Sequence, residues 1–134
     1  MGHTCSTVLI KCMDFRLTRD VYSWLEEKQL VNDCDIISVA GATKDLVENP
    51  QGYVFSLIKL AIKLHQVKKV ILMHHMDCGA YGGNAAFQNK AEEIAKHKAE
   101  VNKAREIIVS QYPKIEIESY LVFFAEKGWR VEAI

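Results

Sequence analysis

The fold is decided by the stretch VILMHHMDCG (residues 70–79), in which an apolar run gives way to polar side chains. Its first four residues predict a short, buried β-strand. His75 and Cys78 then stand where that strand ends. An earlier apolar run, Thr7–Ile10, ends in a similar way, because Cys12 follows it closely. Two predicted strands are therefore followed, at their carboxyl ends, by side chains that commonly bind metals.

These side chains can meet only if the first and third strands are parallel neighbours. The chain must then run out to the second strand and cross back over the first. This creates a topological switch point, which is where open α/β sheets bind their ligands. Strands are predicted at residues 7–10, 35–39, 70–73, 117–124 and 129–134, and helices at 18–30, 54–62 and 87–112. A tight turn at Glu126-Lys127-Gly128 is expected to join the last two strands.

Short apolar strands that alternate with helices imply a mostly parallel sheet. We therefore predict an α/β fold with four to five strands in the order 2-1-3-4, a C-terminal edge strand, and helices on both faces. The chain of 134 residues shows neither a linker nor a repeat. Its length fits a single domain over residues 1–134.

The composition excludes several classes of partner. Seventeen basic and seventeen acidic residues cancel, so the charge gives no reason to expect nucleic acid or an anionic membrane surface. The apolar runs are too short to span a bilayer, and the first residues lack the pattern of a secretory signal. We expect a cytoplasmic protein with no nucleic-acid or membrane partner. In that compartment its four cysteines serve more readily as thiols or metal ligands than as disulfides.

Cys12, His75 and Cys78 are the candidate metal ligands. Two thiolates and one imidazole suit Zn²⁺, and three protein ligands leave a fourth position open, as in catalytic zinc sites. His75 is favoured over His74 because adjacent residues of a strand face opposite sides of the sheet. His74 is expected to pack nearby.

The remaining cysteines and two further histidines are expected to lie elsewhere. Cys5 stands seven residues before Cys12, which is about 20 Å along a strand. Cys34 opens the second strand, at the other end of the sheet. Both are expected to be packed or surface thiols. His65 and His97 fall on predicted helices and are expected to face solvent.

The motifs Cys12-x-Asp14-x-Arg16 and His75-x-x-Cys78-Gly79 resemble the paired zinc motifs of the β-class carbonic anhydrases. The order of the motifs and their position after predicted strands are similar as well. The pair Ala40-Gly41, which follows the second strand, resembles the Asn-Ala-Gly turn of that family. The resemblance covers the whole chain, from the first strand to the closing strands.

The resemblance implies that Cys12, His75 and Cys78 hold Zn²⁺, with water or hydroxide in the fourth position. It implies that Asp14 accepts a hydrogen bond from this hydroxide, while Arg16 pairs with Asp14 and keeps it ionised. The implied activity is the reversible hydration of carbon dioxide to bicarbonate by a zinc-bound hydroxide.

A homodimer is also expected. Family sites lie at a subunit interface, and the apolar segment Tyr120–Phe124 offers more hydrophobic surface than a small domain readily covers. The small-molecule partners implied by the resemblance are carbon dioxide and bicarbonate.

Other functions remain open at this point. A zinc module without catalysis could use the metal for folding or for a partner. A hydrolase of carbonyl sulfide or carbon disulfide would share the same ligands. A cysteine phosphatase is disfavoured because the sixth residue after Cys78 is Asn84 and not arginine. Finally, Cys12 and Cys78 could be small buried apolar residues, although five matching positions at two strand ends make coincidence the weaker explanation.

Overall fold

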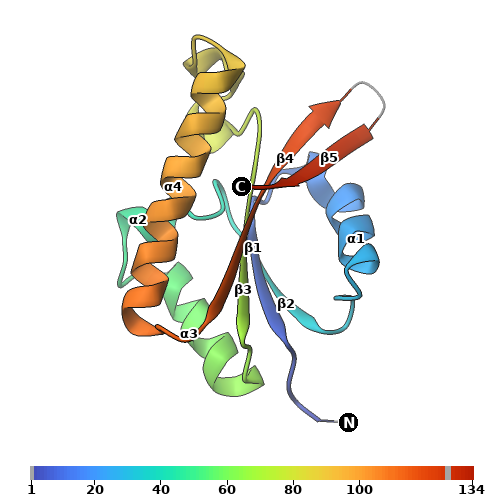
Figure 1. The fold of residues 1–134 in the computed structure, drawn as a ribbon, viewed down its shortest axis with the longest axis vertical. Helices are drawn as coiled ribbons and strands as arrows, with labels where there is room; N and C mark the ends of the chain where they lie inside the picture. Colours follow the sequence, from blue (N-terminus) through green and yellow to red (C-terminus); the bar gives the residue numbers. More distant parts are fainter. Residues whose placement is uncertain (1, 126–127) are drawn as a thin grey trace.

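A twisted, mostly parallel sheet forms the centre of the molecule (Figure 1). The computed structural model describes residues 2–125 and 128–134. The strands run in the order β2-β1-β3-β4-β5, with β5 antiparallel to β4 and the other neighbours parallel. The strands are β1 (Thr7–Lys11), β2 (Cys34–Ser38), β3 (Lys69–His75), β4 (Glu116–Ala125) and β5 (Gly128–Ala133). The predicted α/β class, strand order and C-terminal edge strand are confirmed.

Helices cover both faces of this sheet, as predicted. The α-helices are α1 (Thr18–Glu27), α2 (Lys44–Glu48), α3 (Tyr53–His65) and α4 (Lys90–Gln111). Single 3₁₀ turns occur at Phe15–Leu17, Gly79–Tyr81 and Asn84–Ala86. Helix α1 lies on one face of the sheet, and α2, α3 and α4 lie on the other (Figure 1).

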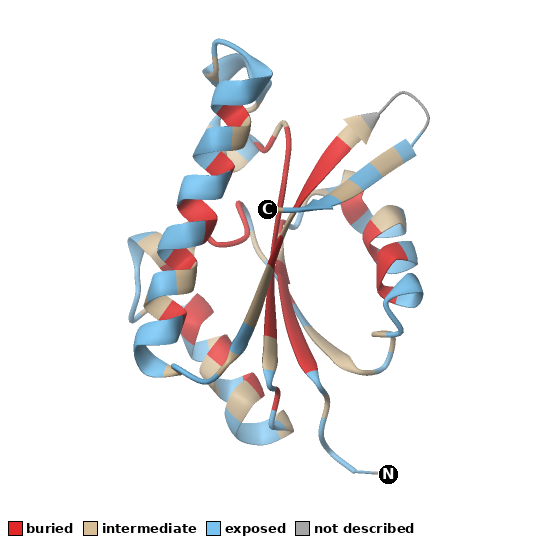
Figure 2. Cartoon of the chain, viewed as in Figure 1, coloured by how far each residue is buried: buried red, intermediate tan, exposed pale blue. Residues whose placement is uncertain are grey.

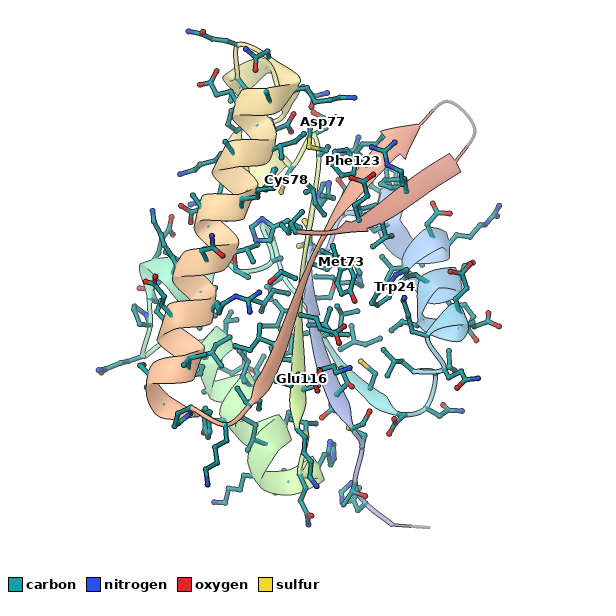
Figure 3. The ribbon with its side chains drawn as sticks, viewed as in Figure 1. Trp24, Met73, Asp77, Cys78, Glu116 and Phe123 are labelled. Atoms are coloured by element: carbon teal, nitrogen blue, oxygen red, sulfur yellow. The ribbon has the colours of Figure 1, made fainter. Side chains whose placement is uncertain are left out.

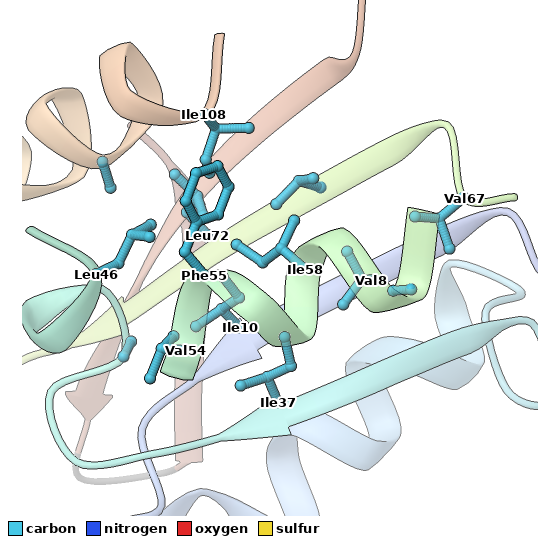
Figure 4. Packing of buried hydrophobic residues seen from close by; sticks show 14 of the residues in the cluster. Val8, Ile10, Ile37, Leu46, Val54, Phe55, Ile58, Val67, Leu72 and Ile108 are labelled. Atoms are coloured by element: carbon cyan, nitrogen blue, oxygen red, sulfur yellow. The ribbon is translucent and has the colours of Figure 1, made fainter. Parts of the chain in front are cut away.

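The central strands β1 and β3 are buried on both faces (Figure 2). On the α3 side, Phe55 and Ile58 belong to one apolar cluster with Ile10 and Leu72 (Figure 4). On the α1 side, a second apolar cluster joins three helix residues, Val21, Trp24 and Leu25, to residues of β1 and β3. Burial of each such side chain contributes on the order of 1.5–3 kcal/mol. Burial on both faces explains why the sequences of β1 and β3 are continuous apolar runs.

Most element boundaries differ from the sequence prediction by a few residues, and α2 was not predicted. Helix α4 begins at Lys90 and not at Phe87, because the side chain of Asn89 caps it by accepting a hydrogen bond from the Glu92 backbone N–H at 2.9 Å. Helix α1 ends at Glu27, before the predicted end at residue 30. The predicted turn at Glu126-Lys127-Gly128 lies mostly outside the described residues.

Two predictions about exposure were wrong. His97 is fully buried on α4, because it lies on the same helix face as Val101 and Ala104. Half-buried His65 contacts Asp35 instead of facing solvent freely. The apolar segment Tyr120–Phe124 is also covered within the chain, since Leu121 and Val122 are buried and Phe123 is nearly so. That segment therefore offers no large surface for a partner.

Candidate metal centre

Cys12, His75 and Cys78 lie together at the carboxyl ends of β1 and β3. The register that pairs Lys11 with Met73 brings the two strand ends to the same level. As a result, one ligand atom of each of the three side chains lies within 4.8 Å of the others. All three residues are buried. Figure 3 shows Cys78 and Asp77 at the end of β3, opposite the end where β4 begins with Glu116.

A tight turn returns Cys78 to the end of its strand. Asp77 takes a left-handed conformation (φ 56°), and the carbonyl of Cys78 accepts hydrogen bonds from the N–H groups of Tyr81 (3.0 Å) and Gly83 (2.9 Å). Gly83 has φ 73°, and an added Cβ would stand 3.0 Å from the Asp77 carboxylate. Glycine is therefore required where this turn closes against the site.

The histidine presents an unprotonated nitrogen to the two thiols. His75 Nδ1 lies 2.7 Å from the carbonyl oxygen of Met76, which can only accept, so the ring proton belongs on Nδ1. His75 Nε2 then keeps its lone pair, and within the described residues this buried atom has no hydrogen-bond partner. A buried acceptor without a partner is costly in a native structure, and a metal ion would satisfy it.

The separation of the two sulfur atoms also fits one metal ion. Cys12 Sγ and Cys78 Sγ lie 3.9 Å apart. Two thiolates on a tetrahedral Zn²⁺ with bonds of about 2.3 Å would stand about 3.8 Å apart. The hydrogen bond from Cys78 lowers the pKa of Cys12, whereas the pKa of Cys78 is raised by its interaction with Cys12 and by burial. The residues present therefore fit Zn²⁺.

Asp14 and Arg16 stand beside these three side chains in a fixed arrangement. Arg16 Nη2 donates to Asp14 Oδ2 at 2.7 Å, and Arg16 Nε donates to Asp14 Oδ1 at 3.1 Å. Hydrogen bonds from Arg16 lower the pKa of Asp14 to about 2. Asp14 Oδ2 also lies 3.8 Å from His75 Nε2. An ionised carboxylate therefore borders the open side of the candidate centre.

Arg16 is held from a second direction that the sequence did not reveal. Its Nη1 donates to Asp77 Oδ2 at 3.1 Å, its Nη2 donates to the Asp77 carbonyl at 3.0 Å, and its guanidinium carbon lies 4.4 Å from the centre of the Phe124 ring. Asp77 is itself fixed, because its N–H donates to the buried Glu93 carboxylate at 2.6 Å. The only sequence signal for Asp77 was its place next to Cys78.

His74 faces the other side of the sheet from His75. Its Nε2 lies 2.6 Å from Thr43 Oγ1, and its Nδ1 lies 2.8 Å from His97 Nδ1. Burial lowers the pKa of His74 to about 3 and that of His97 to about 4, so both rings are neutral at pH 7. This pair links β3 to α4 behind the candidate centre. Cys5 and Cys34 lie at the opposite end of the sheet.

The comparisons with known proteins identify the family. A family model described as "Putative carbonic anhydrase" matches residues 2–134. The chain belongs to this carbonic anhydrase family. It is 32% identical over 124 residues to an uncharacterised protein of Rickettsia conorii, a match that covers 87% of the chain and 67% of the relative. It is 36% identical over 87 residues to the "Putative carbonic anhydrase" of Bacillus subtilis, covering 64% of the chain and 42% of that protein.

Solved structures show that the chain has the fold of the β-carbonic anhydrases. The β-carbonic anhydrase isoform I of Trichomonas vaginalis superposes with a TM-score of 0.65 at 15% identity, over 98% of the chain and 85% of that structure. The β-carbonic anhydrase CafD of Aspergillus fumigatus superposes with a TM-score of 0.55 at 14% identity, over 99% of the chain and 91% of that structure. Among the described residues, no helix combines the length and apolar character needed to cross a membrane.

Proposed function

We propose that this member of the family is a zinc enzyme that hydrates carbon dioxide reversibly to bicarbonate. The observation that carries the proposal is the unpartnered His75 Nε2, buried within 4.8 Å of two thiols and bordered by an ionised Asp14. Cys12, His75 and Cys78 would hold the ion. Zn²⁺ would supply a Lewis acid that lowers the pKa of a water molecule to about 7.

The role of Asp14 follows from its charge and its position. Its carboxylate stays ionised at neutral pH, so it can only accept hydrogen bonds. Placed 3.8 Å from His75 Nε2, it can accept a hydrogen bond from the attacking water and turn the oxygen lone pair toward the carbon of carbon dioxide. Addition of that oxygen to the carbon, with loss of a proton, gives bicarbonate.

Arg16 acts through Asp14 and is a positioning residue. Its hydrogen bonds to both Asp14 oxygens and to Asp77 hold the carboxylate in one orientation. The arginine also prevents the free carboxylate from turning toward a cation at the centre, because the carboxylate's own charge is already paired.

A homodimer remains part of the proposal, on a surface different from the one expected from sequence. Ile36, Tyr53, Leu60 and Leu64 are each about half exposed or more. Together with neighbouring residues they line an apolar groove of about 440 Å³ between β2, an edge strand of the sheet, and α3. An apolar groove beside an edge strand is a surface that a second copy could cover.

The test is zinc content combined with a stopped-flow assay of carbon dioxide hydration on the same purified protein. We expect bound zinc and hydration that disappears in Cys12→Ser and Cys78→Ser, whereas Cys34→Ser retains both. Zinc with no hydration would overturn the proposal in favour of a zinc module without catalysis. Hydrolysis of carbonyl sulfide or carbon disulfide, without hydration of carbon dioxide, would identify a sister hydrolase.

A further inference from the structure

A second cluster of metal-binding side chains lies at the opposite end of the sheet from the candidate centre. Cys5 precedes β1, Asp35 lies in β2, and His65 is the last residue of α3. One ligand atom of each lies within 4.8 Å of the other two. The cluster is about 20 Å from Cys12 along β1. It is therefore a separate site, which the proposed function does not use.

His65 is the central member of this cluster. Its Nδ1 lies 2.6 Å from Asp35 Oδ2, and its Nε2 lies 3.2 Å from Nε2 of His3. The backbone N–H of Cys5 donates to the carbonyl of His65 at 3.0 Å, which fixes the thiol-bearing segment against the end of α3. A histidine ring binds a metal ion through one nitrogen, so an ion shared with Asp35 would lie at His65 Nδ1, and His3 would hold the opposite nitrogen of the ring.

The cluster also borders open space. A cavity of about 280 Å³ separates the amino-terminal segment from the start of β2 and the end of α3. The residues that line it are Gly2, His3, Thr4, Cys5, Asn32, Cys34, Asp35 and His65. This volume has room for an ion and for small movements of its ligands. None of the three candidate ligands is fully buried, so an ion could reach them from solvent.

We propose that Cys5, Asp35 and His65 bind a second divalent ion of the zinc type, while His3 holds the other ring nitrogen of His65. One thiolate, one carboxylate and one imidazole form a set that Zn²⁺ accepts. Its role would be structural, because it would tie the amino-terminal segment to β2 and α3, which the Asp35–His65 hydrogen bond already joins.

The thiol must lose its proton when the ion binds. Burial raises the pKa of Cys5, so without metal the thiol is protonated at neutral pH. In the absence of an ion, the Asp35–His65 hydrogen bond would hold the ring in place. The alternative reading is that these residues form only an ion pair beside an unrelated thiol, and it predicts no second bound ion.

The test is equilibrium dialysis of the untagged full chain against Zn²⁺ after removal of metal with a chelator. We expect two ions per wild-type chain and one ion per chain in Cys5→Ser, His65→Gln and Asp35→Asn. His3→Ala should lower the affinity for the second ion by about tenfold or more. Cys34→Ser is the matched control, because it removes a thiol from the same cavity outside the proposed ligand set, and should bind two ions.

Spectroscopy and heat denaturation separate this site from the first. With Co²⁺ in place of Zn²⁺, Cys5→Ser should lose part of the thiolate-to-metal charge-transfer absorption, and Cys12→Ser should lose a different part. Added Zn²⁺ should raise the Tm of wild type more than that of Cys5→Ser. One ion per wild-type chain, unchanged by Cys5→Ser, would overturn the proposal. Loss of the second ion in Cys34→Ser but not in Cys5→Ser would do so as well.

Discussion

Asp14 is the residue on which catalysis depends most, because it is not needed merely to hold an ion. Four hydrogen bonds link Asp14 to Arg16, one of them from the Arg16 backbone N–H at 2.8 Å. The local sequence Asp14-x-Arg16 explains this arrangement, since the carboxylate caps the 3₁₀ turn that carries the arginine. This pairing was implied by the family resemblance, whereas the contact between Arg16 and Asp77 joins residues 61 positions apart and left no local pattern.

The first prediction concerns this pair. Asp14→Asn and Arg16→Ala should retain zinc but lose hydration activity by about a hundredfold, because the group that orients the attacking water is lost or released. Zinc analysis and stopped-flow hydration on the same samples measure both effects. Glu26→Gln, which removes an exposed carboxylate from α1, is the control and should match wild type. Wild-type turnover in Asp14→Asn would refute the assigned role.

At the scale of elements, the spacing of apolar residues in α4 indicated that His97 is buried, although histidine is a polar residue. Ile94, His97, Val101 and Ala104 follow the spacing of one helix face, and three of these four residues are fully or almost fully buried. The sequence prediction placed His97 on a helix and expected it to face solvent. The structure corrects this, since His74 on β3 supplies a hydrogen-bond partner that could not be identified from the sequence.

The second prediction follows from that contact. His97→Ala should lower the free energy of unfolding by about 2–4 kcal/mol, because it opens a cavity and leaves the buried His74 Nδ1 without its partner. Urea denaturation measures the change. Lys98→Ala, at the next and exposed position of α4, should change stability by less than about 0.5 kcal/mol. Equal stability of His97→Ala and Lys98→Ala would show that the buried pair is not stabilising.

The third prediction concerns the ion pair that joins the starts of β3 and β4. Lys69 Nζ lies 2.7 Å from Glu118 Oε2, and this hydrogen bond lowers the pKa of Glu118. A carboxyl whose pKa is lower in the folded state stabilises the fold above its unfolded pKa, and the effect is lost as pH falls through the folded pKa. Glu118→Gln should therefore lower the free energy of unfolding by about 1 kcal/mol or less at pH 7.

The difference in the free energy of unfolding between wild type and Glu118→Gln should shrink once the pH falls below about 4.5, the ordinary pKa of a glutamate. Denaturation of wild type and Glu118→Gln at several pH values provides the measurement. Glu116→Gln is the matched control, because Glu116 lies 3.8 Å from Lys69 and is more exposed, so its removal should matter less. A Glu118→Gln effect that grows in acid would contradict this account.

At the scale of the whole molecule, the strand order was predictable because the expected metal ligands had to lie close together. Cys12 and Cys78 can share an ion only if β1 and β3 are neighbours, and the short crossovers then leave β2 on the outer side of β1. The surface properties were less predictable. Apolar residues in β4 suggested an uncovered face, but Leu121 and Phe123 pack with Ile94 of α4, and Val122 clusters with residues of α1. Several exposed apolar side chains lie in β2 and α3 instead.

The fourth prediction is that the protein is a homodimer in solution. Light scattering coupled to gel filtration at micromolar concentration should give twice the chain mass of 15.2 kDa. Leu60→Lys, which places a charge in the groove beside α3, should shift the protein toward the monomer. A zinc-bound wild type that is monomeric at this concentration would refute the dimer. A dimer unaffected by Leu60→Lys would place the interface elsewhere.

The most direct test of the central claim is anomalous diffraction from crystals of the zinc-loaded protein, recorded at the zinc absorption edge. The account predicts a peak bounded by Cys12 Sγ, Cys78 Sγ and His75 Nε2, with bonds of about 2.3 Å to sulfur and about 2.0–2.1 Å to nitrogen. It also predicts that Asp14 remains paired with Arg16. A map with no peak between these three side chains, or a peak held by His74 in place of His75, would contradict it.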